Sequence, residues 1–187
     1  MGTSGIIIII IAGLFVILAG YVIGVYNKLV NSRNKVDNQF SQIDIQLKRR
    51  SDLIPNLVET VKGYAKHEKE TLTEVIEARN KAVNANGINA KVEAENELSG
   101  VLSRLFALTE AYPELKANTN FMSLQNDLKD TEDKITYARQ FYNDSAMNYN
   151  NLVDMFPSNI VASMFKFVKY DFFLAEEKAK EAPKVKF

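Results

Sequence analysis

Few residues in this sequence combine the types and spacings that metal binding requires. His67 is the only histidine, and it lies in the charged run 66–70, where we expect it to face solvent on a helix. A carboxylate-bridged metal site in a helical bundle needs a Glu-x-x-His motif from each of two helices. Tyr64 occupies the position three residues before His67, and there is no second histidine. The chain also has no cysteine, which excludes thiolate ligands and disulfides, so we expect no metal and no cofactor.

The acidic clusters likewise do not indicate catalysis. Glu93, Glu95 and Glu97, like Asp130, Glu132 and Asp133, are spaced as on solvated helix faces, with nothing apolar nearby to raise their pKa values. A catalytic triad would have to use His67, and neither a Gly-x-Ser-x-Gly elbow nor a glycine-rich phosphate loop occurs. The sequence therefore predicts that the protein is not an enzyme, and no small-molecule substrate is evident. Lys+Arg and Asp+Glu both number 23, so no net field draws in nucleic acid.

Arg50 is the most unusual charged residue. It ends the basic run Lys48-Arg49-Arg50 and occupies a slot in an apolar seam where leucine or isoleucine would be expected. Such an arginine needs a carboxylate or free carbonyls nearby, and a structural ion pair is the favoured interpretation. A kink at Pro55 could also supply a partner, because it would free the carbonyl of Ser51. Arg50 lies about 25 residues, or about 37 Å of straight helix, beyond the apolar N-terminal segment, which argues against direct lipid contact.

The apolar segment from Ile6 to Val25 predicts a transmembrane anchor. Its twenty uncharged residues would span about 30 Å, the thickness of the hydrocarbon core. A cleaved signal peptide is the alternative, but the segment is too long and no basic residue precedes it. Basic residues follow it, beginning with Lys28, Arg33 and Lys35, so the positive-inside rule predicts a single-pass protein of the cytoplasmic membrane with its bundle in the cytoplasm.

Three glycines share one face of this segment. Gly13, Gly20 and Gly24 are spaced by seven and four residues, and the last two form a small-xxx-small pair that would let a second helix approach closely. The alternative is that glycine is simply common in membrane helices. Self-association through this face is therefore one hypothesis for a partner.

The rest of the chain predicts an all-α fold, an antiparallel bundle of three to four long helices after the anchor. A seam runs from Val36 to Tyr64 through Pro55, which favours one kinked helix over a hairpin at residues 50–55. The first clear break is at residues 84–89, where Gly87 suits a helix C-cap, and a second helix begins near Ala90. Pro113 ends or kinks it, and a third helix keeps a regular seam from residue 121 to residue 156.

Three domains are expected: an anchor at residues 1–25, a bundle at 26–174 and a disordered charged tail at 175–187. The segment 158–173 is amphipathic as a helix capped by Ser158, and Phe165, Val168 and Phe172 lie on its apolar face. It could close the end of the bundle or lie on the bilayer surface.

These motifs together resemble the LemA family of bacterial membrane proteins. The resemblance covers nearly the whole chain after the anchor. It rests on YNxLV with RN at residues 26–34, QIDIQLKRRxDLIPNLVETV at 42–61, YPxLKAN at 112–118, ARxxYN at 138–143, YN at 149–150 and FP at 156–157. One departure is Phe40, where the family pattern leads us to expect tryptophan.

The resemblance implies a single-span protein with a domain of long antiparallel helices and no established enzymatic activity. A relative tied to magnetosome membranes implies a role in organising membranes or partner proteins. Several polar motif residues are left unexplained by the seams, and they are candidates for structural networks or an interaction surface: Arg50, Asp52, Pro55, Asn56, Asn118, Arg139 and Asn143. The leading hypothesis is a non-enzymatic scaffold that binds a protein partner; the alternative is a protein that organises or binds the lipid surface through its aromatic C-terminal segment.

Overall fold

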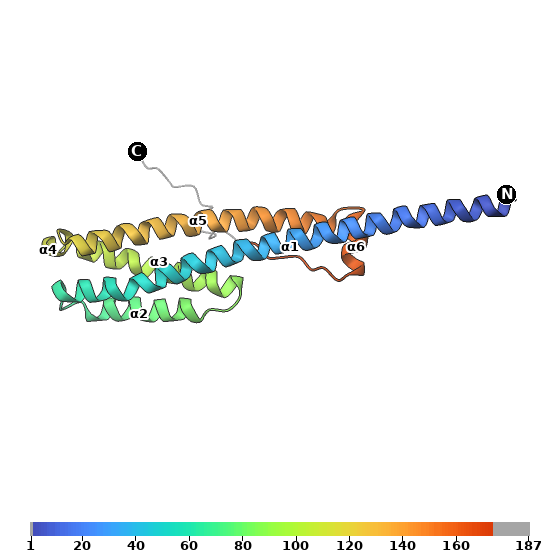
Figure 1. Ribbon diagram of the computed structural model, residues 1–187. Coiled ribbons are helices and arrows are strands. Elements are labelled where there is room, and N and C mark those ends of the chain that lie inside the picture. Colours follow the sequence, from blue (N-terminus) through green and yellow to red (C-terminus); the bar gives the residue numbers. More distant parts are fainter. Residues whose placement is uncertain (1, 174–187) are drawn as a thin grey trace, which may run out of the picture. The chain divides into compact units, whose positions relative to one another are not determined.

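The computed structural model describes residues 2–173, and the regular structure of this part is entirely helical (Figure 1). The helices are α1 (Thr3–Tyr64), α2 (Lys69–Asn84), α3 (Ile88–Thr109), α4 (Pro113–Lys116), α5 (Thr119–Asp154) and α6 (Ser158–Met164). The predicted all-α class, with a long apolar N-terminal helix and several helices packed together, is confirmed. The tail predicted at residues 175–187 lies outside the described residues, and the boundary between anchor and bundle stays a prediction.

Helix α1 is continuous for 62 residues with Pro55 inside it. The single helix expected through Pro55 is therefore confirmed, the kink expected at that residue stays a prediction, and the alternative hairpin at residues 50–55 is wrong. The first part of α1 is apolar enough to cross a membrane, and none of the most apolar window is buried. Its large apolar side chains from Ile7 to Leu18 are each more than half exposed, the exposure that a lipid-facing helix needs.

The chain reverses at residues 65–68, a break that the sequence did not predict. The first break was expected only at residues 84–89, but α1 ends at Tyr64 and α2 begins at Lys69. The reversal has no glycine or proline, and the apolar spacing of Ala65, Leu72 and Val75 continues the seam across it, so the pattern hides the turn. In the fold these three side chains share one core with Val61, which explains why the chain doubles back.

The break after α2 is where the sequence placed it, although its glycine has a different role. Gly87 has a φ of +84° and directly precedes α3, whereas Ala85 follows α2 with an extended backbone. Glycine adopts this positive φ without a Cβ clash, so Gly87 starts α3 rather than capping α2. Pro113 stands at the first position of the one-turn helix α4, where its missing N–H costs nothing.

The described chain forms two compact units. The first contains residues 2–39 and 142–171, and the second contains residues 40–141 and 172–173. Leu29, Val36, Tyr142 and Tyr149 are almost fully buried in the first unit. The second unit has a larger core, drawn from the end of α1, from α2, α3 and α4, and from the start of α5.

Helix α5 follows its predicted seam until its C-terminal end. Phe121, Leu128, Ile135 and Tyr149 are buried as expected, but Phe156 is 78% exposed because α5 ends at Asp154. Helix α6 then ends at Met164, so the single helix expected over residues 158–173 is wrong. The predicted cap is wrong too: Ser158 is the first residue of α6, and its hydroxyl donates to the carbonyl of Met155.

Candidate functional site

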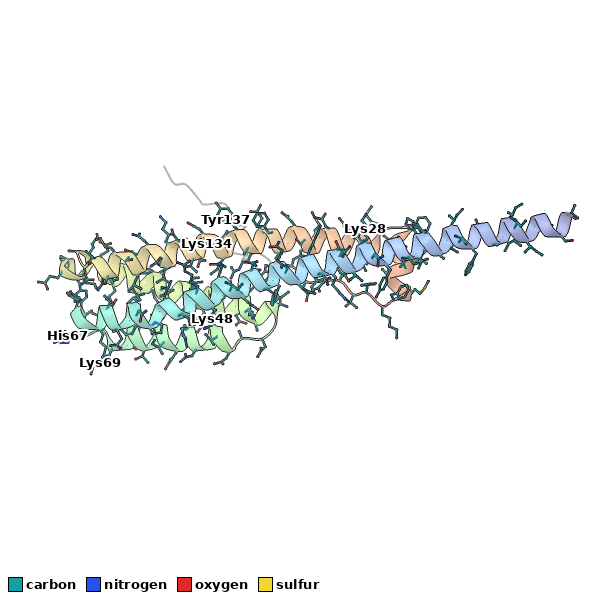
Figure 2. All side chains as sticks on the ribbon, in the orientation of Figure 1. Lys28, Lys48, His67, Lys69, Lys134 and Tyr137 are labelled. Atoms are coloured by element: carbon teal, nitrogen blue, oxygen red, sulfur yellow. The ribbon has the colours of Figure 1, made fainter. Side chains whose placement is uncertain are left out.

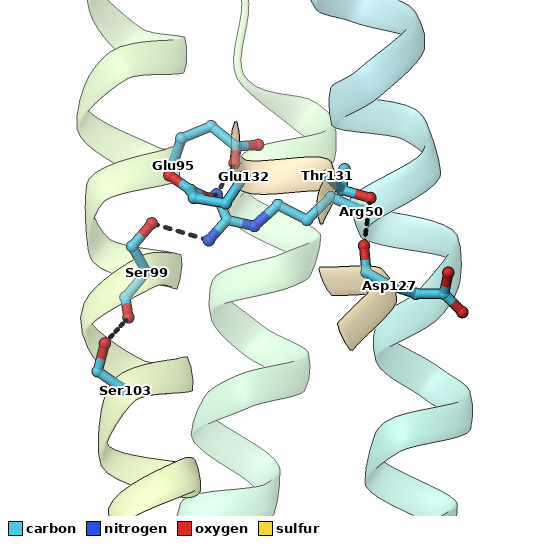
Figure 3. A network of polar contacts seen from close by, with 7 residues as sticks. All are labelled: Arg50, Glu95, Ser99, Ser103, Asp127, Thr131 and Glu132. Atoms are coloured by element: carbon cyan, nitrogen blue, oxygen red, sulfur yellow. Dashed lines mark hydrogen bonds and ion pairs between the residues drawn. The ribbon is translucent and has the colours of Figure 1, made fainter. Parts of the chain in front are cut away.

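Arg50 lies at the centre of a buried polar network in the second unit (Figure 3). It is 4% exposed. Its Nη1 donates to Glu95 Oε2 at 2.9 Å and lies 2.9 Å from Glu132 Oε2, and its Nη2 donates to Ser99 Oγ at 2.8 Å. The ion pair expected for this core arginine is therefore present, and it ties α1 to both α3 and α5.

The sequence did not identify the carboxylates of this network. Glu95 is 4% exposed, so the solvated face expected for it is wrong, and Glu132 pairs with Arg50 although its side chain is 44% exposed. Glu95 precedes Leu98 by three residues and Leu102 by seven, which places it on the apolar face of α3. This spacing was the signal that could have found it.

Burial dominates the electrostatics of the network. Burial raises the pKa of Glu95, and the positive charges of Arg50 and Arg139 oppose that rise. Burial also lowers the pKa of Arg139, opposed by the negative charges of Glu132 and Glu95. The Arg139 guanidinium further lies 5.8 Å from the ring centroid of Phe173. Two arginines and two glutamates thus neutralise one another inside the unit, and the arrangement can hold three helices in register.

Pro55 leaves the carbonyl of Ser51 free as a hydrogen-bond acceptor, and the donor that binds this carbonyl is Arg79 rather than Arg50. The carbonyl of Ser51, which loses its helical donor at Pro55, accepts a hydrogen bond from Arg79 Nε at 3.2 Å. The idea that Arg50 would take this carbonyl is therefore wrong. Arg79 comes from α2, so the proline joins α1 to α2 through a side chain that the sequence did not single out.

The remaining polar candidates are scattered. Asp52 is exposed and pairs with Lys48 at 3.1 Å along the same helix, Asn56 is exposed, and Asn143 is partly buried. Arg50 and Arg139 are the two candidates that share a network. An interaction role for the set stays a prediction.

Asn118 has two structural contacts. Its side-chain oxygen accepts the backbone N–H of Phe121 at 3.0 Å, which caps α5, and its amide donates to the hydroxyl of Tyr64 at 2.9 Å. The predicted capping at residues 118–120 is thus present at Asn118. The second bond ties the start of α5 to the end of α1.

Replacing Asn118 by alanine should lower the free energy of unfolding by about 1–2 kcal/mol, because both bonds are lost. Chemical unfolding in detergent, followed by circular dichroism, measures the change. Asn120→Ala is the matched control, since Asn120 is exposed in the first turn of the same helix. Equal effects of the two substitutions would contradict the capping role.

The candidates proposed for membrane contact belong to two different units, and their contact with the membrane stays a prediction. Phe165 and Val168 belong to the first unit and are 47% and 77% exposed, whereas Phe172 belongs to the second unit. At Gly13, Gly20 and Gly24 an added Cβ would meet no described atom within 4 Å. These glycines are open to a second helix, and their role in self-association stays a prediction.

A cleft of about 1060 Å³ lies between the end of α1 and the start of α2. Its floor is apolar, with Val58, Leu72 and Ile76, and its rim is charged: Glu59, Lys62, Lys66, His67 and Lys69. His67 and Lys69 project at this turn in Figure 2. His67 is exposed, as expected, but in the turn rather than on a helix. The sequence could not reveal the cleft, because the cleft exists only through the unpredicted reversal at residues 65–68.

No group of three or more His, Asp or Glu side chains within residues 2–173 is placed to hold a metal ion. The cleft contains one imidazole and one carboxylate among lysines, an arrangement that suits binding of an anionic surface. The buried network suits stability, and the cleft is the better candidate for a binding site.

Three curated bacterial proteins are similar in sequence to this chain. The chain is 27% identical over 131 residues to Protein LemA of Metamycoplasma hominis, an alignment that covers 70% of this chain and 60% of that protein. It is 24% identical over 165 residues to Magnetosome protein MamQ 2 of Paramagnetospirillum magneticum, covering 74% and 60%. It is also 24% identical over 155 residues to Magnetosome protein MamQ of Magnetospirillum gryphiswaldense, covering 69% and 57%.

The chain thus spans about three fifths of the length of the curated relatives that it matches. The family match and the apolar first part of α1 together indicate a membrane-associated protein. The family model matches residues 39–187, which is most of the chain and includes the whole Arg50 network. By this match, and as the sequence motifs predicted, the chain belongs to the LemA family.

Proposed function

We propose that this protein is a non-enzymatic scaffold, anchored in the bacterial cytoplasmic membrane by the first part of α1, that binds a partner protein in the cleft between α1 and α2. The observation that supports this function is the cleft itself, an apolar floor within a basic rim. The cationic residues that follow the apolar segment support placement of the second unit in the cytoplasm.

The charges of the rim favour an acidic partner. Three lysines and one histidine face one carboxylate, Glu59, which already pairs with Lys62 at 3.2 Å. Lys66 and Lys69 are exposed and extend the positive potential beyond the floor. A partner with acidic residues would therefore be attracted, and a basic one repelled.

The shape favours a helix as the occupant. The floor runs between two helices, and Val58 and Leu72 are each 7% exposed at its base. An amphipathic helix binds such a groove by laying one apolar stripe on the floor. We infer that the partner presents an acidic amphipathic helix whose glutamates or aspartates flank that stripe.

A pair of synthetic helices tests this proposal. One peptide carries a leucine stripe flanked by glutamates, and the other carries the same stripe flanked by lysines. The full-length protein in detergent should bind the acidic peptide at least about tenfold more tightly at low salt, which corresponds to about 1.4 kcal/mol. Fluorescence anisotropy of the labelled peptides gives both affinities.

Charge reversal provides the control. Lys66→Glu with Lys69→Glu should reverse the preference, whereas Lys129→Glu with Lys134→Glu, two exposed lysines of α5, should leave it unchanged. Equal affinity for the two peptides, or the same response in both double variants, would refute an acidic helix as the occupant. In cells, a photo-crosslinker at Thr73 in the cleft should capture a product that one at the exposed Tyr137 does not.

A second candidate function is organisation of the lipid surface by the C-terminal segment. One observation favours it: Phe156 and Val168 are 78% and 77% exposed.

A further inference from the structure

The segment after α5 lies against the part of α1 that directly follows the apolar run. The ring of Tyr26, the first residue after that run, lies 4.8 Å from the ring of Phe165 and 5.7 Å from that of Phe167. The Arg33 guanidinium lies 5.6 Å from the ring of Phe167. Tyr26 and Arg33 are separated by about 10 Å of helix, so the segment lies within about 10 Å of the end of the apolar run.

The order of these contacts fixes the direction of the segment. Tyr170 donates to Asp37, Phe167 meets Arg33, and Phe165 meets Tyr26, so the chain approaches the apolar run as its numbering falls. Helix α5 runs the opposite way in the first unit, so it approaches the apolar run as its numbering rises. Asn150 bonds the backbone of Tyr170, and further along Asp154 pairs with Lys169. The end of α5 and all of α6 therefore lie at the level of α1 nearest to the apolar run.

At this level the unit exposes a group of large apolar side chains, here called the interfacial patch. Its members are Met155, Phe156, Ile160, Met164, Phe165 and Val168, and they are 47–78% exposed. The neighbouring backbone is held in place, because Asn150 clamps Tyr170 with two hydrogen bonds of 2.9 Å and Tyr142 donates to the carbonyl of Asp171 at 3.0 Å. The exposure is thus built into the fold, and leaving it in water would be costly.

The turn that ends α6 adds a second observation. The N–H of Phe167 donates to the carbonyl of Ala162 and that of Lys166 to the carbonyl of Ser163, the pattern that ends helices in a left-handed residue. The left-handed residue is Lys166, with a φ of +57°, where glycine would be less strained. A lysine is thus held exposed between the patch members Phe165 and Val168. A basic side chain beside apolar ones is the composition that binds anionic bilayer surfaces.

We propose that the interfacial patch inserts into the surface of the same bilayer that α1 crosses, so that the protein contacts lipid at two places. This inference rests on the proposed placement of α1 in the membrane. Phe156 and Val168 enter the boundary between headgroups and acyl chains, and Lys166, Lys28 and Arg33 meet the phosphates. The patch would fix the tilt and rotation of α1, because a second contact removes the freedom that a single span leaves.

Spin labels can measure the depth of each position, since the chain has no cysteine and single cysteines can be introduced freely. The full-length protein is reconstituted into vesicles of zwitterionic and anionic phospholipid. Each label is exposed to oxygen, which concentrates in lipid, and to a water-soluble nickel chelate. Labels at Phe156→Cys and Val168→Cys measure the depth of the patch, and a label at Phe15→Cys measures that of the proposed span. A label at Tyr137→Cys is the reference for a position in water, since Tyr137 is 61% exposed in the second unit.

The oxygen-to-nickel ratio at positions 156 and 168 should be at least about threefold above that at position 137, and below that at position 15, because the patch lies at the boundary rather than in the core. A ratio at 156 and 168 equal to that at 137 overturns the proposal. Shielding of both labels from oxygen and nickel alike also overturns it, because a protein would then cover the patch. A nickel-accessible label at position 15 would instead refute the placement of α1 itself.

Discussion

Replacing Arg50 by methionine is expected to lower the free energy of unfolding by about 3–5 kcal/mol, the cost of removing one partner from a buried ion pair. Glu95 would keep its carboxylate in a site that is 4% exposed, without the guanidinium that now donates to it at 2.9 Å. Ser99 would lose the same donor. Urea unfolding of the full-length protein in detergent, followed by circular dichroism, measures the loss.

Two further variants identify the cause. Arg49→Met removes a neighbouring arginine that pairs with Asp127 at 3.5 Å with both side chains more than 40% exposed, so its cost should be below about 0.5 kcal/mol. Arg50→Met with Glu95→Met removes both members of the buried ion pair and leaves Arg139 with the charge of Glu132, so it should recover most of the stability. If the double variant is as unstable as Arg50→Met alone, the loss comes from packing rather than from an unpaired carboxylate.

The Arg50→Met deficit should also depend on pH. Burial already raises the pKa of Glu95 above its ordinary value of 4.5, and removing Arg50 takes away the largest charge that opposes the rise. An acid with a raised pKa in the folded state contributes stability that is full below its unfolded pKa and lost as pH rises through the folded pKa. The deficit of Arg50→Met should therefore be small below about pH 4.5 and grow towards neutral pH. A deficit that does not change with pH would exclude Glu95 as its origin.

The sequence predicted the helices well wherever one apolar seam persists. The seam from Val36 to Tyr64 and the one from residue 121 to Tyr149 each became part of a single helix, because burial of one face decides helix formation over such lengths. The persistence of the apolar seam also explains the main error, which is the missed reversal at residues 65–68. A seam carried on from Ala65 to Leu72 looks identical whether the helix continues or folds back on itself, and only packing against α3 and α5 decides between them.

The candidate sites were less predictable because they depend on pairs from different helices. Arg50 stands out in the sequence as a misfit in its seam, but the spacing of Glu93, Glu95 and Glu97 predicts a solvated face. In the structure Glu93 and Glu97 are exposed, whereas Glu95 is buried and pairs with Arg50. The cleft joins Val58 to Ile76 across the missed reversal. At the C-terminal end, the apolar face expected from a helical wheel was broken at Met164, because the left-handed backbone of Lys166 ends α6. The local sequence pattern can single out an unusual residue such as Arg50. Its partner, however, comes from another helix and is set by tertiary packing.

We expect two substitutions in α1, Leu14→Lys and Ile17→Lys, to abolish the proposed attachment to the membrane. Leu14 and Ile17 lie near the middle of the apolar run and are 67% and 71% exposed, so a lysine at either would enter the centre of the bilayer. Each lysine costs about 3 kcal/mol at that depth, and the pair about 6 kcal/mol, which lowers partition into the membrane by about four orders of magnitude. The double variant should therefore leave the membrane fraction when the membranes of expressing cells are washed with alkaline carbonate.

The control places the same two charges on the second unit. Ile45 and Val83 are 56% and 53% exposed, and Ile45→Lys with Val83→Lys should stay in the washed membrane, since neither side chain belongs to the apolar run. Alkaline carbonate releases proteins that are bound only to the membrane surface. The interfacial patch alone therefore cannot retain the variant with Leu14→Lys and Ile17→Lys. Retention of that variant would mean that another segment carries the attachment. Its release, with the control retained, would locate the attachment in the first part of α1, because the two variants add identical charge and differ only in where the lysines lie.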